Sequence, residues 1–194
     1  MEQENTQVKE QEQKKKQPIF SAKKIAVMAV FTALAYVVSI LDFSIFPAAP
    51  FLKLDFGNVF IMLVGFLYGP IEGIIVCVLK EVIHIPFGTT GGVGELANII
   101  STTAYILVPS VLYRFKKGLK VVLPSLAIAI IVATAVNLPV NRFINFPLYM
   151  GGGAAEAFNG VWHFIVFFNL IKGAAIAAVT CILYKHISRL LNKI

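Results

Sequence analysis

Residues 57–87 of the chain read GNVFIMLVGFLYGPIEGIIVCVLKEVIHIPF. The stretch is almost entirely apolar, and Gly69-Pro70 interrupts it near the middle with a pair that ends or turns a helix. A helix needs about 20 apolar residues to cross the core of a bilayer, so these residues form either one long span or two short ones. This choice decides whether the chain crosses the membrane an odd or an even number of times.

The composition of the whole chain is that of a protein embedded in a lipid bilayer. Of its 194 residues, 58% are apolar and 14% are charged, and the mean hydropathy is +0.80. Soluble domains contain about 25% charged residues, so this chain lacks the polar surface that a soluble fold of its size needs. A soluble enzyme and a nucleic-acid-binding domain are therefore excluded as leading interpretations.

The placement of basic residues predicts the topology. Four further apolar segments occur at 25–41, 96–113, 121–144 and 161–184. Nine of the 13 basic residues beyond the N-terminal tail form three clusters, at Lys23 and Lys24, at Arg114, Lys116, Lys117 and Lys120, and at Lys185, Arg189 and Lys193. Basic clusters favour the cytoplasmic side of a membrane. If all three lie there, 57–87 crosses twice, in spans of about 23 Å each at 1.5 Å per residue.

The predicted fold is therefore an all-α membrane protein, a bundle of six transmembrane helices with both termini in the cytoplasm. The bundle occupies residues 21–194. Residues 1–20 are rich in Gln, Glu and Lys and contain too few apolar residues for a core, which predicts a disordered cytoplasmic tail.

Several ionisable residues fall inside apolar segments, where charge is costly and usually functional. They are Glu72, Lys80, Glu81, His84 and Lys172. The alternative is a structural ion pair, for example Lys80 or Lys172 with Glu81. Glu81 and His84 make half of a zinc-protease pattern, but Lys80 stands where the first histidine belongs, and no nucleophile elbow or phosphate loop occurs. We expect neither a metal site nor an enzyme.

Polar residues gather on the predicted outer side. Asn141 and Asn169 lie in the outer halves of their helices and Lys172 lies slightly deeper, below predicted loops at 42–56, 88–95 and 145–160. An Asn side chain offers a donor and an acceptor together, which suits a neutral heterocycle with N–H and C=O groups on one edge. The prediction is an outward-facing ligand pocket, which aromatic side chains could cover: Phe43, Phe46, Phe51, Phe56 and Phe87. Amides that only bond between helices are the alternative.

Small residues form a stripe on the first helix. Ala22, Ala26, Ala29 and Ala33 follow one another at spacings of four, three and four. Such a stripe allows another helix to approach closely, either inside the bundle or on a partner subunit.

Taken in order, these and several other pieces resemble the substrate-binding S components of energy-coupling factor (ECF) vitamin transporters, most closely the riboflavin-specific type. The resemblance runs from about residue 22 to 185. It rests on the alanine stripe, Phe51-Leu-Lys-Leu-Asp-Phe56, Leu67-Tyr-Gly-Pro70, Gly91-Gly-Val-Gly-Glu-Leu-Ala-Asn98, Asn141 before Phe146-Pro-Leu-Tyr149, and Phe168-Asn-Leu-Ile-Lys-Gly173.

The resemblance implies a multi-pass protein of the bacterial cell membrane that captures riboflavin from outside, with FMN open as a second ligand. Riboflavin would be cargo, and no cofactor is expected. Transport would require an ECF module made of a transmembrane coupling protein of the EcfT type and two ATPases. In similar proteins the alanine stripe contacts the coupling protein, which here implicates Ala26, Ala29 and Ala33.

The resemblance also implies the ligand contacts. Asn141, Asn169 and Lys172 match the residues that hold the isoalloxazine ring. The ribityl chain would lie against Gly94, Glu95 and Asn98 and against Leu54 and Asp55 of the first outer loop. Three departures from the family pattern concern the expected site: Gly57-Asn58 stand where Ser-Asp is frequent, Arg142 stands where an aromatic residue is common, and the fifth loop carries Gly151-Gly152-Gly153.

Two other transport functions stay open at this point. One is an S component for thiamine, pantothenate or folate, although anionic vitamins call for more outer cations than Lys53, Arg142 and Lys172. The other is a self-sufficient small transporter, which should show inverted repeats or a polar stripe that reaches both faces.

Overall fold

The structure is a computed structural model that describes residues 21–88 and 90–191. The predicted tail at residues 1–20 lies outside this range. The described chain is mostly helical. Its longer helices are α2 (Ala22–Ser39), α3 (Gly57–Leu67), α4 (Pro70–His84), α5 (Val93–Phe115), α6 (Leu119–Val140) and α8 (Ala154–Leu191). The shorter elements are β1 (Phe43–Ser44), β2 (Lys53–Leu54), η1 (Ile85–Phe87), the π-helical turn η2 (Asn141–Asn145), α7 (Phe146–Met150) and η3 (Gly151–Gly153).

Residues 57–87 fold as two long helices, α3 and α4, and the predicted break at Gly69-Pro70 is confirmed. Gly69 has a φ of 122°, a backbone conformation that side chains disfavour, and Pro70 occupies the first turn of α4, where its missing N–H costs nothing. At 1.5 Å per residue, α3 is about 17 Å long and α4 about 23 Å long. Gly57, the first residue of α3, lies directly against α2. A side chain at this position would collide with the backbone oxygen of Ala35, so the close approach requires glycine.

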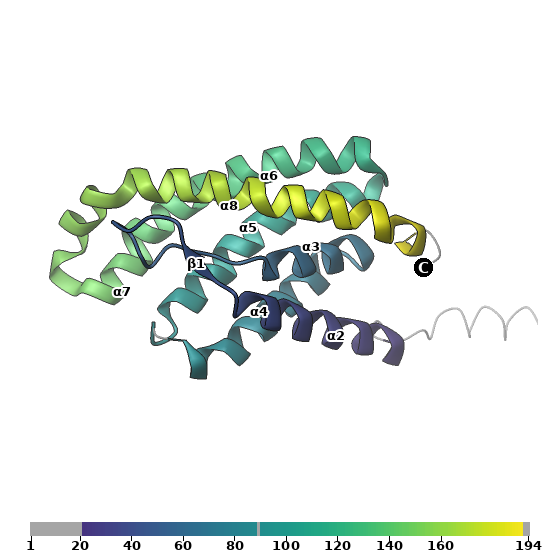
Figure 1. Ribbon diagram of the computed structural model, residues 1–194, viewed down its shortest axis with the longest axis horizontal. Coiled ribbons are helices and arrows are strands. Elements are labelled where there is room, and N and C mark those ends of the chain that lie inside the picture. Colours follow the sequence, from purple (N-terminus) through teal and green to yellow (C-terminus); the bar gives the residue numbers. More distant parts are fainter. Residues whose placement is uncertain (1–20, 89, 192–194) are drawn as a thin grey trace, which may run out of the picture.

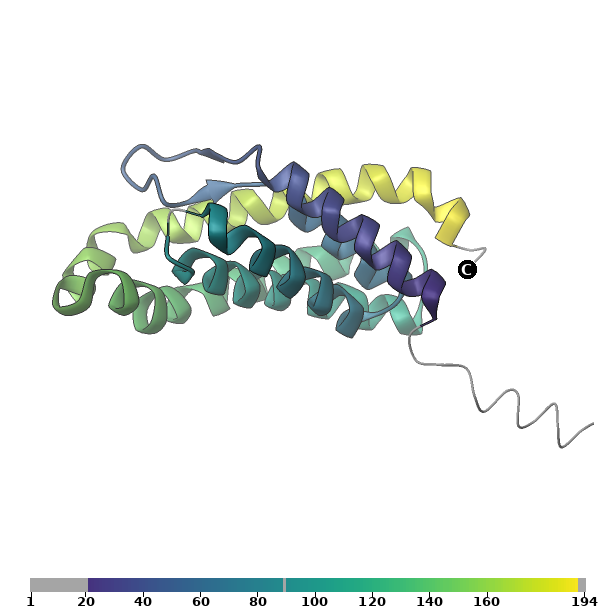
Figure 2. The same cartoon turned by 90° about the horizontal axis from the view of Figure 1, so that it is seen from below.

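The helices run roughly along one long axis (Figures 1 and 2). The start of α2, the turn between α5 and α6, and the C-terminal part of α8 gather at one end. The loop that carries β1 and β2, together with α7, lies toward the opposite end. The two strands pair antiparallel, with Phe43 opposite Leu54, and so fold this loop into a short hairpin.

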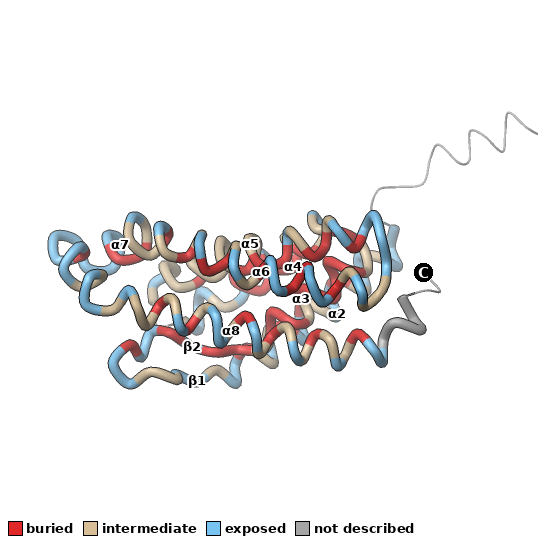
Figure 3. The backbone as a smooth tube through the Cα atoms, turned by 90° about the horizontal axis from the view of Figure 1, so that it is seen from above, coloured by how far each residue is buried: buried red, intermediate tan, exposed pale blue. Residues whose placement is uncertain are grey.

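The outside of the bundle is apolar, which is the reverse of a soluble protein. Figure 3 shows buried positions facing inward and exposed positions around the periphery. Large apolar side chains among those exposed include Ile25, Val30, Val37, Ile71, Leu123, Ile131, Phe167 and Ile182. By length and composition, three described helical stretches could cross a membrane: Ala22–Ser39, Val93–Phe115 and Leu119–His186, the last of which contains α6 and most of α8.

The third predicted outer loop is wrong, because residues 145–160 are largely helical. Pro147 suggested a loop, but it lies in the first turn of α7, where proline is tolerated. Only the glycines 151–153 turn the chain, and the alanine-rich sequence that follows starts α8. The ring of Phe146 packs edge-on against Phe158 at 5.7 Å, which holds the two arms of this hairpin together.

Candidate functional site

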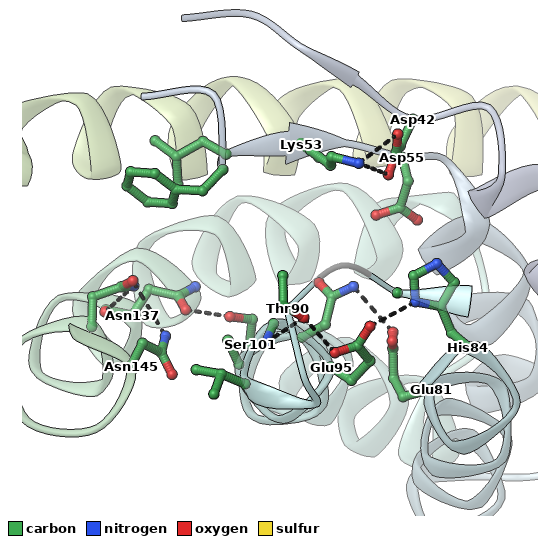
Figure 4. Close-up of a pocket in the computed structure, with 18 of the residues that line it drawn as sticks. Asp42, Lys53, Asp55, Glu81, His84, Thr90, Glu95, Ser101, Asn137 and Asn145 are labelled. Atoms are coloured by element: carbon green, nitrogen blue, oxygen red, sulfur yellow. Dashed lines mark hydrogen bonds and ion pairs between the residues drawn. The ribbon is translucent and has the colours of Figure 1, made fainter. Parts of the chain in front are cut away.

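A cavity of about 540 Å³ lies beneath the hairpin loop. Its wall comes from that loop, from the ends of α2, α4 and α6, from the start of α5, from η2 and α7, and from the middle of α8. In Figure 4, amide side chains occupy one side of the cavity, and carboxylates and a histidine occupy the other. The two groups are described in turn.

The first group is an amide ladder made of Asn137, Asn141, Asn145 and Asn169. Asn145 Nδ2 donates to Asn141 Oδ1 at 3.2 Å, and Asn141 Nδ2 donates to the backbone oxygen of Asn137 at 2.8 Å. Asn137 Nδ2 crosses to α8 and donates to Asn169 Oδ1 at 2.7 Å. The hydroxyl of Ser101 on α5 donates to Asn137 Oδ1. The ladder therefore ties α5, α6 and α8 together with uncharged groups.

The π-helical turn explains how three of these amides share one wall. Residues four apart in an α-helix drift around the axis, because four residues exceed one turn of 3.6. A π-helical turn is wider, so the step from Asn141 to Asn145 turns the other way and offsets the drift of the step from Asn137 to Asn141. All three residues accordingly line the cavity.

The second group is a charge cluster made of Asp55, Lys80, Glu81, Asn98 and Lys172. Lys172 Nζ donates to Asp55 Oδ2 at 2.9 Å and to Asn98 Oδ1 at 3.4 Å. Lys80 Nζ and Asn98 Nδ2 both donate to Glu81 Oε1, at 2.8 and 3.1 Å. Two cations thus meet two anions, and the cluster joins the hairpin loop to α4, α5 and α8.

The charge of Asp55 is stabilised although the residue is only 4% exposed. Burial by itself would raise the pKa of Asp55, but the positive charges of Lys172 and Lys80 outweigh that effect and hold its pKa below the ordinary value. The backbone N–H of Gly57 adds a hydrogen bond of 3.1 Å to Asp55 Oδ1. Asp55 is therefore an ionised anchor that fastens the end of the loop to α8.

The rim of the cavity next to α5 is a third set of polar contacts. Glu95 Oε1 lies 2.8 Å from His84 Nδ1, and Glu95 Oε2 accepts a hydrogen bond of 2.6 Å from Thr90. Thr90 Oγ1 in turn accepts from the backbone N–H of Gly94 at 3.1 Å. These bonds fix the glycine-containing connection between α4 and α5. The contact with Glu95 also gives a partner to His84, one of the ionisable residues inside the apolar segments.

Seven of the eight ligand residues expected from the sequence line the cavity. They are Asp55, Gly94, Glu95, Asn98, Asn141, Asn169 and Lys172. Leu54 does not line it. Its side chain is buried in a small apolar cluster with Leu52 and Phe168. Contact between any of the eight and a ligand stays a prediction.

Several lining residues were missed. Asn137, Asn145 and Ser101 line the cavity, as do Phe146 and Phe168. The repetition of asparagine at 137, 141 and 145 was a usable signal, since residues four apart lie on one helix face. Of the five phenylalanines that could cover a ring, Phe51 and Phe87 line the cavity.

The remaining ionisable residues have partners. The structural pair between Lys80 and Glu81, one of the two alternatives, is present, and both side chains are almost fully buried. Lys24 pairs with Glu72 at 2.5 Å and so joins α2 to α4. Arg142 does not line the cavity and donates to the backbone oxygen of Ala155 at 2.8 Å.

The alanine stripe lies on the surface. Ala26, Ala29 and Ala33 are exposed, whereas Met28, Thr32 and Ala35 on the other face of α2 are buried. The stripe is therefore not used for packing inside the described bundle.

Comparison with known proteins agrees with this picture. The family model described as "ECF transporter, substrate-specific component" matches residues 23–184. The riboflavin transporter RibU of Staphylococcus aureus (strain TCH60) is 32% identical in an alignment of 177 residues that covers 89% of this chain and 94% of that protein. The riboflavin transporter FmnP of Bacillus subtilis (strain 168) is 30% identical over 176 residues, covering 84% and 90% of the two chains.

A solved structure is also similar. The S component of a bacterial ECF transporter superposes with a TM-score of 0.78 at 31% identity, over 87% of this chain and 97% of that one. The resemblance found in the sequence is thereby confirmed at the level of the family and its helical membrane fold.

Proposed function

This chain belongs to the substrate-specific components of ECF transporters, and we propose that it is the riboflavin-binding component of such an importer. The family makes it an integral membrane protein and a transport subunit rather than an enzyme. The two relatives named above are both riboflavin transporters, which favours riboflavin over thiamine, pantothenate or folate and over a self-sufficient transporter.

The observation that carries the proposal is the pairing of charges around the cavity. Each described lysine that lines it has an acidic partner: Lys53 with Asp42, Lys80 with Glu81, and Lys172 with Asp55. Among the described residues that line the cavity, no lysine is left over for an anionic ligand, whereas the amide ladder offers donors and acceptors without net charge. The cavity therefore suits an uncharged ligand rich in polar groups, and a flavin with a ribityl chain is one.

The same argument ranks the two flavins. The phosphate of FMN carries a charge of about −1.5 to −2 at pH 7. Placing it beside the paired lysines would require breaking a salt bridge, and Glu95 adds a further negative charge at the rim. Riboflavin is the ligand proposed here, with FMN as a weaker one.

Within the cavity, the proposed contacts follow the two polar groups. Asn141 and Asn169 would hold the heterocycle, and Lys172 would donate to a ring carbonyl with the proton that now reaches Asn98. Asp55 and Asn98, which both contact Lys172, and Glu95 on the rim would face the ribityl hydroxyls.

The proposed topology places six spans, α2, α3, α4, α5, α6 and α8, across the bilayer, with both termini in the cytoplasm and the cavity facing outward. Its support is the clustering of basic residues at one end: the start of α2, the α5–α6 turn and the last part of α8 lie together, away from the hairpin loop. Positive charge favours the cytoplasmic side.

The proposed docking site for the coupling protein of the ECF module is the exposed stripe of Ala26, Ala29 and Ala33 on α2. Small exposed residues on a membrane helix allow a second helix to approach closely. Transport would then draw its energy from the two ATPases of that module.

The test is flavin binding by the full chain purified in detergent from cells grown with riboflavin. We expect a yellow preparation. After the bound flavin has been removed, titration of the protein with riboflavin should quench flavin fluorescence stoichiometrically. Thiamine and folate, tested as competitors in excess, should not displace the flavin. A colourless protein that does not quench would refute the assignment, and displacement by thiamine would move it to another vitamin.

A further inference from the structure

We propose that Asn145 is a ligand contact that selects for an N–H group on the bound ring, an inference that rests on the proposed function. None of the motifs that carry the family resemblance includes this residue. It lines the cavity at the π-helical turn and is only 8% exposed.

The first step of the argument is an accounting of the acceptors in the amide ladder. Asn137 Oδ1 accepts from Ser101, Asn141 Oδ1 accepts from Asn145, and Asn169 Oδ1 accepts from Asn137. The oxygen of Asn145 is buried and has no donor in the described part of the chain. It is thus the one ladder oxygen without a hydrogen bond there.

The second step concerns the energetic meaning of that oxygen. Buried polar groups in proteins are nearly always hydrogen-bonded, and an orphaned one calls for an explanation. A ligand N–H that donates to Asn145 Oδ1 would remove the desolvation penalty of the unpaired oxygen and add a hydrogen bond. The unpaired oxygen therefore favours binding of a ligand with such an N–H group.

The third step is complementarity with a flavin. The pyrimidine edge of the isoalloxazine ring presents a carbonyl, an imide N–H and a second carbonyl in a row, and so needs a donor, an acceptor and a donor. Each ladder amide has two N–H groups. Asn141 uses one on the backbone oxygen of Asn137 and Asn169 uses one on the backbone oxygen of Ile165, so one donor remains on each. The free acceptor is Asn145, which takes the imide N–H.

The geometry leaves Asn145 free to adjust. Its bond to Asn141 is the longest of the ladder at 3.2 Å, against 2.7 Å for the bond from Asn137 to Asn169. The terminal torsion of an asparagine is soft, so a small turn of the amide brings the oxygen to the ligand.

The experiment compares riboflavin with 3-methylriboflavin, in which a methyl group replaces the imide hydrogen. Dissociation constants are measured by fluorescence quenching for the full chain, for Asn145→Leu and for the smaller Asn145→Ala. The wild-type protein should prefer riboflavin at least tenfold. Both variants should bind riboflavin about tenfold or more weakly than wild type, and in Asn145→Ala the preference should fall to near one.

The control is Thr180→Val. Thr180 Oγ1 is also buried and has no hydrogen-bond partner among residues 21–88 and 90–191, but the residue does not line the cavity. It lies about 12 Å further along α8 than Lys172 at 1.5 Å per residue. This variant should leave both dissociation constants unchanged.

The outcomes separate the two proposals. If wild type fails to bind riboflavin, the proposed function is wrong and this inference falls with it. If wild type binds riboflavin but Asn145→Ala keeps the full preference over 3-methylriboflavin, or loses affinity for both flavins by one factor, Asn145 does not read the imide and only this inference is overturned.

Discussion

Replacing Glu81 by glutamine should destabilise this protein far more than its small chemical change suggests. Glu81 is 1% exposed and Lys80 is 2% exposed, and their charged atoms are 2.8 Å apart. With an effective dielectric constant of about 20, the gross attraction at this distance is on the order of 6 kcal/mol. Desolvation of the two ions offsets most of it, so the intact pair contributes little net stability.

The single substitution removes the attraction between the two charges but leaves the desolvation cost of Lys80. In Glu81→Gln, Lys80 keeps its buried charge but loses the adjacent carboxylate, which typically costs about 3–5 kcal/mol. For a chain of this size, 1 kcal/mol corresponds to roughly 2–4 °C, so the melting temperature should fall by about 6–20 °C. The double variant Lys80→Met with Glu81→Gln removes both charges and should recover most of the loss.

The assay is thermal unfolding of the ligand-free protein in detergent, followed by the loss of monodisperse protein. The matched control is Lys53→Met, which breaks the exposed pair with Asp42 and should shift the melting temperature by no more than a few degrees. A Glu81→Gln protein that melts within about 2 °C of wild type would refute the reasoning. So would a double variant that melts lower than Glu81→Gln alone, because the two charges would then not compensate each other.

Three further predictions concern binding, transport and pH. FMN should bind at least tenfold more weakly than riboflavin in quenching titrations, and equal affinities would contradict the argument from paired lysines. Ala33→Leu should bind riboflavin normally but abolish uptake in cells that contain the ECF module, whereas Ala178→Leu, the same change on an exposed face of α8, should transport normally; uptake by Ala33→Leu would exclude the stripe as the docking site. Because the pKa of Asp55 is lowered on folding, its salt bridge with Lys172 adds stability above the ordinary pKa of 3.8 and loses it as the pH falls through the lowered value. The difference in melting temperature between wild type and Asp55→Asn should therefore be constant from pH 8 to about pH 5 and shrink only below about pH 4, and a difference that already disappears at pH 6 would contradict an ionised Asp55.

The residues that the sequence revealed in the site are those whose chemistry conflicts with their surroundings. Asn141, Asn169 and Lys172 stand out because polar groups are costly inside apolar spans, so their presence there needs no structure to be noticed. Asn137 and Asn145 carry the same signal but were not among the ligand residues expected from the sequence. The helical form of residues 145–160 was missed because proline and glycine were taken as loop residues without regard to their place in a helix turn.

The sequence by itself determined the membrane environment, the helices and the break at Gly69-Pro70, since these depend on composition and on neighbours within a few residues. The tertiary structure alone decided which polar groups meet. Asp55 and Lys172 are 117 positions apart, and Asn137 and Asn169 are 32 apart, yet each pair shares a hydrogen bond. A carboxylate can pair with any cation that packing brings within reach, so the choice of partner, and with it the charge balance of the cavity, follows from how the helices and the hairpin loop pack together.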